Sequence, residues 1–161
     1  MKNTELPTAV EVRELLEGML GRDIEMAIVG DKVTPDSPGC VVGEYVDVMG
    51  KVHAVIAADL NTAAYMGAAI ALVPAGGAEA SVEDGFLSDT LRENFGEVLN
   101  VMGSLFNKDD SIHLKLEGVF DSAQVAVPST AARLMSGFGP SLSTNTEVKG
   151  YGKGLLSVLL P

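Results

Sequence analysis

The sequence predicts an α+β fold in which two similar halves, each with a helix and three strands, share one sheet with helices packed against it. The 161 residues suit a single domain spanning residues 1–161, and 47% of them are hydrophobic, enough for one sizeable core. Alternating and helical patterns follow one another as helix, three strands, helix, then helix and three strands. This order is the evidence for two halves.

The first half of the chain predicts a helix, three strands and a second helix. The first helix begins at the capping-box motif Thr8-Ala9-Val10-Glu11 and ends at Gly21. Strands are expected over residues 23–29, 40–48 and 52–58, the last two joined as a hairpin. The second helix runs over about 62–73, after a capping Asp59 or Asn61.

The second half predicts one long helix followed by three strands. The small, acidic segment 75–85 contains a Gly-Gly pair and predicts a loop. The long helix begins at Ser88 or Thr90 and runs to about Phe106. Strands are expected over residues 112–120, 142–150 and 155–160, with a helical turn near 130–135.

The composition excludes several classes of partner. A formal net charge of −11, with 11 Lys and Arg residues scattered along the chain, gives no basic stripe for nucleic acid and disfavours anionic membrane surfaces. The longest apolar stretch, residues 63–73, is too short to span a bilayer. Cys40 is the only cysteine and no apolar signal segment follows the N-terminus, so we expect a cytoplasmic protein.

The long predicted helix holds the main candidate site. On a helical wheel its apolar residues gather on one side: Leu91, Phe95, Val98, Leu99, Met102, Leu105 and Phe106. The opposite side carries four polar residues at steps of four, three and four: Glu93, Glu97, Asn100 and Ser104. Gly96 and Gly103 share one flank between these sides.

An ordinary amphipathic helix explains the polar side, because a solvated face often carries glutamate and asparagine. It does not explain the two glycines, each of which costs about 1 kcal/mol relative to alanine inside a helix. We therefore expect close packing or an accessible backbone on the flank of Gly96 and Gly103. Asparagine is also unfavourable in mid-helix unless its amide is used. The pattern alone leaves a solvated face and a functional face both open.

The segment Gly96-Glu97-Val98-Leu99-Asn100 resembles the Glu-x-x-Asn signature of the CheC, CheX and FliY chemotaxis phosphatases. The surroundings are similar to the single-site, CheX-like members. A first helix leads into strands, a glycine-containing hairpin over 43–58 precedes an alanine-rich helix, and a Gly-Gly turn precedes the signature helix. The resemblance covers essentially the whole chain and implies one CheX-like domain.

Two positions differ from the family pattern. Glu93 stands where the family usually has Asp or Ser, four residues before the signature glutamate. Pro128 corresponds to the family's downstream proline but lies farther from Asn100. The first helix has three glutamates but no asparagine three residues after any of them, so a second site, as in CheC, is not expected.

The resemblance implies a phosphatase that hydrolyses the aspartyl-phosphate of a CheY-type response regulator, in the two-component signalling of chemotaxis. Asn100 would orient the attacking water, and Glu97 would engage the lysine of the receiver's active site. Glu93 and Ser104 would add contacts to the partner. The chain would need no cofactor of its own, because the receiver domain supplies Mg²⁺, and it would form a homodimer.

No other motif predicts a reaction. The glycine-rich segment 150–154 lacks the spacing of a phosphate-binding loop, and His53 and His113 stand far apart in strand patterns, so no metal site is expected. Three hypotheses remain: a receiver phosphatase, a non-catalytic CheC-like interaction domain that binds a receiver or flagellar-switch protein, and a homodimer whose polar helix face serves only solubility. The first requires Asn100 to be exposed beside Glu97.

Overall fold

The structure is a computed structural model that describes residues 3–161. Within this range, a six-stranded antiparallel sheet has the order β1-β5-β6-β3-β2-β4. The strands are β1 (Ile24–Ile28), β2 (Val41–Val46), β3 (Val52–Ala58), β4 (Lys115–Asp121), β5 (Ser141–Val148) and β6 (Gly152–Leu159). The helices are α1 (Ala9–Leu20), α2 (Leu60–Ile70), α3 (Ala75–Asp84), α4 (Asp89–Met102), the 3₁₀ helix η1 (Gly103–Phe106) and α5 (Ser129–Ser136). The predicted α+β fold class is confirmed.

Each half of the chain completes the sheet of the other. The hairpins β2-β3 and β5-β6 lie side by side in the centre, joined through β3 and β6. Strand β1 precedes the first hairpin but pairs with β5, and β4 precedes the second hairpin but pairs with β2. If β1, β2 and β3 are replaced by β4, β5 and β6, and the reverse, the strand order read from one edge of the sheet becomes the order read from the other edge. The two similar halves predicted from the sequence are therefore present, and the outer strand of each half pairs with the hairpin of the other.

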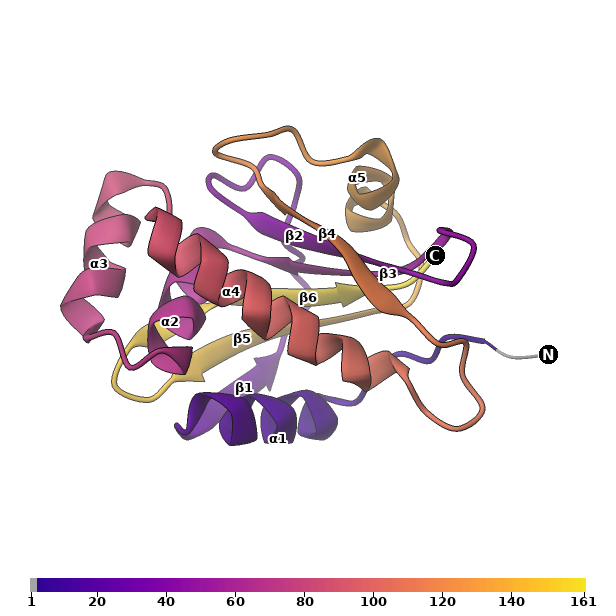
Figure 1. Cartoon of the computed structure of the whole chain (residues 1–161), viewed down its shortest axis with the longest axis horizontal. Coiled ribbons are helices and arrows are strands. Elements are labelled where there is room, and N and C mark those ends of the chain that lie inside the picture. The colour runs from indigo at the N-terminus through magenta and orange to yellow at the C-terminus, as the bar shows by residue number, and fades with distance from the viewer. Residues whose placement is uncertain (1–2) are drawn as a thin grey trace.

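The helices cover the two faces of the sheet unequally (Figure 1). Helices α1, α2 and α4 pack on one face and bury the main core, whereas α5 packs on the other face over a smaller cluster. Helix α3 packs against α2 rather than on the sheet. Helix α4 lies next to β4, the strand at one edge, so its outer side is open to solvent.

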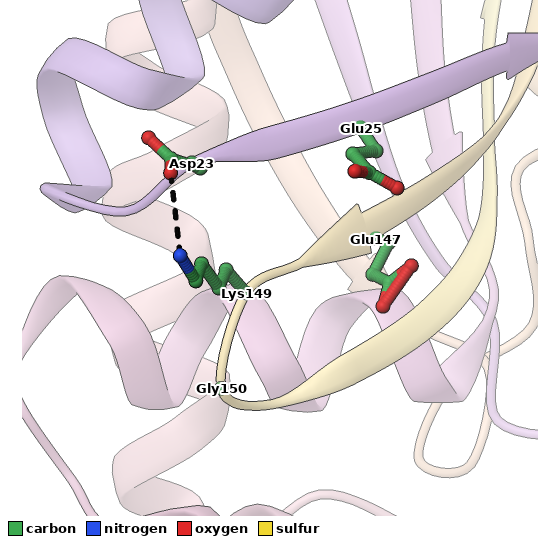
Figure 2. A pocket seen from close by; sticks show the side chains of 5 residues that line it. All are labelled: Asp23, Glu25, Glu147, Lys149 and Gly150. Atoms are coloured by element: carbon green, nitrogen blue, oxygen red, sulfur yellow. Dashed lines mark ion pairs between the residues drawn. The ribbon is translucent and has the colours of Figure 1, made fainter.

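Part of the second face, formed by β1 and β5, carries charged residues. Glu25 and Glu147 stand opposite each other in register (Figure 2). Beside them Nζ of Lys149 lies 3.7 Å from Oδ2 of Asp23. These residues and Gly150 line a shallow hollow of about 300 Å³. This hollow lies on the sheet face opposite α4.

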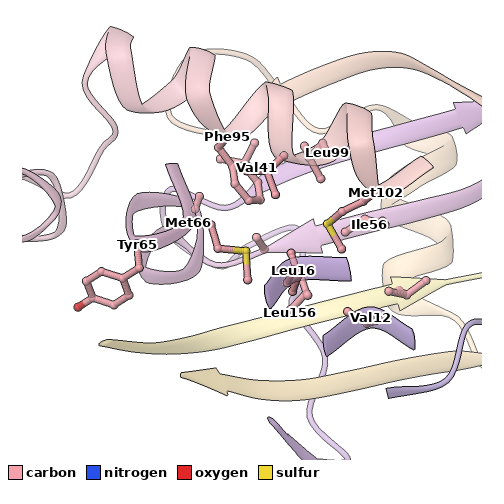
Figure 3. Packing of buried hydrophobic residues seen from close by; sticks show 14 of the residues in the cluster. Val12, Leu16, Val41, Ile56, Tyr65, Met66, Phe95, Leu99, Met102 and Leu156 are labelled. Atoms are coloured by element: carbon pink, nitrogen blue, oxygen red, sulfur yellow. The ribbon is translucent and has the colours of Figure 1, made fainter. Parts of the chain in front are cut away.

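The main core fills the space between the sheet and the layer of α1, α2 and α4. Phe95, Leu99 and Met102 extend from α4 into this space, near Val41 and Ile56 (Figure 3). All five are completely buried. The whole apolar side predicted for the long helix belongs to this cluster: Leu91, Phe95, Val98, Leu99, Met102, Leu105 and Phe106. The predicted orientation of the helix is confirmed.

Capping signals set several of the helix ends. The hydroxyl of Thr8 accepts from the amide of Glu11 at 3.1 Å, and Oε1 of Glu11 accepts from the amide of Thr8 at 3.0 Å. Gly21 ends α1 in the left-handed conformation that favours glycine. Asp59 caps α2 and Ser88 caps α4. These local signals confirm both predicted ends of the first helix and the predicted start of the long helix. The sequence predicts the second helix over about 62–73, but α2 spans Leu60–Ile70 because Asp59, and not Asn61, caps it.

The loop predicted over residues 75–85 is wrong, because helix α3 occupies this segment. The Gly-Gly pair indicates a turn, but Pro74 precedes the helix and Gly85 ends it with a φ of +84°. The buried side of α3 consists of small residues, Ala78 and Ser81. Without large apolar residues at helical spacing, the segment gives no helical pattern to recognise.

Glycines allow α4 to approach its neighbours closely. A Cβ atom on Gly67 of α2 would lie 2.7 Å from the carbonyl oxygen of Leu91. At the same crossing, Nδ2 of Asn94 donates a 2.9 Å hydrogen bond to the carbonyl of Gly67. A Cβ atom on Gly43 of β2 would meet Cδ1 of Leu99 at 3.3 Å. Helix α4 is thus fixed along its length against α2 and the sheet.

Candidate functional site

The polar side of α4 faces solvent. Glu93, Glu97 and Asn100 are exposed on α4, and Ser104 is exposed on η1, which continues it. Glu97 and Asn100 are three residues apart, so their side chains leave the helix on the same face, one turn apart. The structure therefore brings together the four residues that the sequence singles out, and none of them is covered by the chain.

A shallow hollow of about 370 Å³ lies beside Asn100, between the end of α4 and the start of β4. Asn100 and Ser104 line it on the helical side, and Lys115 and Leu116 line it on the strand side. Sequence reasoning missed Lys115, because it lies on a different element and no local pattern links it to the helix. The hollow gives the exposed carboxamide a concave, partly polar surrounding.

Asn107 shapes the wall of this hollow. Its Nδ2 donates a 3.0 Å hydrogen bond to the carbonyl of Leu114, and its Oδ1 accepts a 2.8 Å hydrogen bond from the amide of the same residue. This two-way bond closes the segment between η1 and β4 and holds Lys115 beside the helix end. The sequence indicates only a polar loop here.

The two glycines of the helix have different surroundings. A Cβ atom on Gly103 would lie 3.3 Å from Cε1 of the Tyr45 ring, so the expected close packing exists there. At Gly96 the nearest atom, Cγ2 of Val119, would be 4.0 Å away, which is ordinary contact. Close packing, the first of the two expected reasons for a glycine, is therefore present at Gly103 but not at Gly96, which is partly exposed.

Other candidate chemical groups lie away from the helix. Cys40 is completely buried, and burial raises the pKa of its thiol, so it is not an activated nucleophile. His53 is hydrogen-bonded to Oδ2 of Asp47 at 2.7 Å, which lowers the pKa of that carboxyl. His113 is exposed and lies just before β4 rather than in a strand. Among residues 3–161, no three His, Cys, Asp or Glu side chains are grouped to hold a metal ion.

Protein-family models and curated proteins give no match to this chain. Solved structures give matches over nearly all of it. A chain of the CheX–CheY–BeF3–Mg²⁺ complex from Borrelia burgdorferi is 14% identical, with a TM-score of 0.55 and coverage of 91% of this chain and 90% of the other. FliY from Thermotoga maritima is 17% identical, with a TM-score of 0.53 and coverage of 92% and 81%. A FliG–FliM complex from Helicobacter pylori gives 16% identity, a TM-score of 0.58 and coverage of 95% and 86%.

The chain has the CheC/CheX/FliM fold. The family resemblance read from the segment Gly96-Glu97-Val98-Leu99-Asn100 is confirmed at the level of the fold. The matched structures include a complex of CheX with CheY and a complex of FliM with FliG. Between residues 3 and 161, no helix has the length and apolarity needed to cross a membrane.

Proposed function

We propose that the protein is a phosphatase that removes the phosphoryl group from the active-site aspartate of a CheY-type receiver domain. The observation that supports this most directly is the exposure of Glu97 and Asn100, one turn apart on α4. Burial of either side chain would have left the enzyme without a site. The CheC/CheX/FliM fold, which a chain in a CheX–CheY complex shares, adds to this support.

The reaction requires little covalent chemistry from the protein. A water molecule must be held in line with the phosphorus atom, and the partner must be held in register. The carboxamide of Asn100 can accept one hydrogen bond from the water and donate another nearby without titrating. The water oxygen attacks phosphorus, the bond to the aspartyl oxygen breaks, and phosphate and a free carboxylate are the products.

Glu97 aligns the two proteins by pairing with the lysine of the receiver's active site. Glu93 lies one turn before it and Ser104 one turn after Asn100, so both extend the same strip of surface toward the partner. Mg²⁺ belongs to the receiver and neutralises charge on the phosphoryl group there. This chain contributes the carboxylate, the carboxamide and the surface that carries them.

The test is the rate at which phosphate leaves a receiver domain charged by a small acyl-phosphate donor, with and without the protein. We expect the wild-type protein to accelerate the loss. Asn100→Ala should reduce the acceleration by about 100-fold, because the water loses its positioning group. Glu97→Gln should mainly weaken binding of the receiver, because the ion pair with its lysine is lost.

Matched variants separate these effects from general damage. Asn145→Ala removes an exposed carboxamide on β5, and Glu14→Gln removes an exposed carboxylate on α1. Both should leave the acceleration at the wild-type value. Equal decay with and without the wild-type protein, over several receivers, would refute the enzymatic function.

A second candidate is a non-catalytic interaction domain that binds a receiver or a flagellar-switch protein. The likeness to FliM in its complex with FliG, with a TM-score of 0.58, favours it. The two functions differ in one measurement. An interaction domain would bind a charged receiver or a switch protein without changing the lifetime of the phosphoryl group, whereas the phosphatase would shorten it.

We also propose that the protein is cytoplasmic and forms a homodimer. The net charge of −11 and the single, buried cysteine suit a reducing, aqueous compartment. In the described chain, β1 and β4 are edge strands with one unpaired side each, and Ile28 at the end of β1 is 69% exposed. Sedimentation of the purified protein at several concentrations would distinguish a dimer from a monomer.

A further inference from the structure

Tyr45 of β2 lies beneath the last turn of α4. Its side chain is completely buried, and its hydroxyl donates a 2.5 Å hydrogen bond to the main-chain carbonyl of Leu99. Leu99 directly precedes Asn100. Burial raises the pKa of the Tyr45 hydroxyl, so the group stays protonated and remains a donor at neutral pH.

The carbonyl of Leu99 needs this donor because the helix tightens here. In a continuous α-helix the carbonyl would accept from the amide of Gly103, four residues later. That amide instead donates to the carbonyls of Asn100 and Val101, and the 3₁₀ helix η1 begins. A buried carbonyl without a partner is costly. Tyr45 therefore supplies the donor that the helix no longer provides.

The ring of Tyr45 supports the same turn from below. The backbone of Gly103 rests on its edge, since a Cβ atom there would lie 3.3 Å from Cε1. The ring of Phe106, with its centroid 5.1 Å away and its plane tilted by 56°, packs against the tyrosine ring. The ring and the hydroxyl together fix the distance of this turn from the sheet and the direction of the turn that carries Asn100.

The sheet is irregular on both sides of Tyr45. The register of β2 shifts against β4 between Glu44 and Tyr45, and it shifts against β3 between Tyr45 and Val46. Such irregularities bend strands and re-aim side chains, and they occur often beside functional sites. The irregular register is therefore centred on the residue that supports the end of α4.

We propose that Tyr45 is a positioning residue for Asn100. Its hydroxyl holds the carbonyl of Leu99 and so fixes the direction in which the next side chain leaves the helix. The catalytic part of this inference rests on the proposed phosphatase function. The final turn of a helix frays when it is not held, and a displacement of about 1 Å at a reacting group can cost about 100-fold in rate.

The test compares two tyrosine hydroxyls. Tyr45→Phe keeps the ring against Gly103 and removes only the hydroxyl. Tyr151→Phe is the matched control, because the Tyr151 hydroxyl also donates to a main-chain carbonyl, that of Val73 at 2.7 Å, and lies on the turn between β5 and β6. Both variants are assayed with charged receiver over a range of receiver concentrations. Hydrogen exchange of the amides of residues 100–104 is measured without receiver.

We expect Tyr45→Phe to lower kcat about tenfold with KM unchanged, and to speed exchange at residues 100–104 about tenfold. Tyr151→Phe should leave kcat and this local exchange at wild-type values. A purely structural role for the hydroxyl would lower the melting temperature of both variants and leave kcat alone. An unchanged kcat in Tyr45→Phe, or an equal fall in both variants, overturns the proposal.

The two proposals can fail separately. If the wild-type protein dephosphorylates no receiver, the phosphatase function fails, and hydrogen exchange decides the structural part. Faster exchange confined to residues 100–104 in Tyr45→Phe would then support the role of Tyr45 in setting this turn. Exchange no faster there than in Tyr151→Phe would overturn it.

Discussion

Nε of Arg92, in the first turn of α4, donates a 2.8 Å hydrogen bond to Oδ2 of Asp121, the last residue of β4. A second nitrogen of the same guanidinium reaches Oδ1 of Asp89 at 2.8 Å, and a third donates to the carbonyl of Leu87 at 3.0 Å. The Asp121 side chain is only 3% exposed, whereas that of Asp89 is 92% exposed. One arginine therefore makes a buried and a solvated ion pair.

The two carboxylates should differ strongly in their effect on stability. Asp121→Ala leaves a half-buried guanidinium without its buried partner, and we expect the free energy of unfolding to fall by about 3 kcal/mol. Asp89→Ala removes a solvated partner and should cost less than about 0.5 kcal/mol. Urea denaturation of both variants measures the difference. Similar losses would mean that burial does not decide the strength of this contact.

Glu44 should make stability depend on pH. The residue lies on β2 and is 8% exposed, and its Oε2 has no hydrogen-bond partner among the described residues. Burial raises the pKa of its carboxyl; the amide of Ala131, near the start of α5, opposes this rise, and the charge of Glu117 adds to it. The folded protein therefore holds the proton of Glu44 more tightly than the unfolded chain does.

The sign of the effect follows from this raised pKa. The stabilisation by the proton is complete below the pKa of the unfolded state and is lost as pH rises through the pKa of the folded state. Glu44→Gln removes the titration, so the variant should exceed the wild type in stability by on the order of 1 kcal/mol at pH 7 but not at pH 4. Denaturation at both pH values checks this. A difference that does not change with pH would contradict it.

Alanine at two glycines should act in opposite directions. At Gly67 the new Cβ would lie 2.7 Å from the carbonyl oxygen of Leu91, so α2 and α4 must separate, and we expect a loss of about 1–3 kcal/mol. At Gly18, exposed on α1, nothing lies within 4 Å, and alanine should add about 0.5–1 kcal/mol. Thermal unfolding compares the two. A neutral Gly67→Ala would show that the helix crossing can relax.

Lys115 should contribute to receiver docking. It is the one charged residue among those that line the hollow beside Asn100, and the phosphorylated receiver site is anionic. Lys115→Glu should therefore raise KM about tenfold with little change in kcat, and added salt should reduce the effect. Lys149→Glu makes the same change of charge on the opposite sheet face and should leave KM unchanged. Equal effects of the two substitutions on KM would indicate that the net charge of the protein, and not the hollow, determines receiver docking.

Local signals explain why much of the fold and the polar face could be predicted. The capping box at Thr8 and the hairpin that joins β2 to β3 form within a few residues, so the sequence shows them directly. The wheel of α4 places Glu97 and Asn100 opposite the buried side because helical geometry alone decides this. The role of these two residues remains a prediction.

The rest depends on contacts between distant segments. Helix α3 is held by small residues against α2, and small residues give no periodic signal. Lys115 reaches the site only because β4 runs back beside α4, and Tyr45 lies 54 residues before the carbonyl that it holds. Such contacts depend on how the whole sheet packs, and local sequence patterns carry no information on that packing.

The exchange of β1 and β4 between the halves has a consequence for how the molecule assembles. Neither half contains all the strands that border its own hairpin, so a nascent chain cannot finish the first half until β5 has been synthesised. Helix α4 likewise makes all its contacts with the sheet only after β4 has paired with β2. Long-range pairing of this kind slows folding. A chain cut between α3 and α4 would give two fragments with open hairpin edges, each able to recombine with the other or to capture a strand from a neighbouring copy.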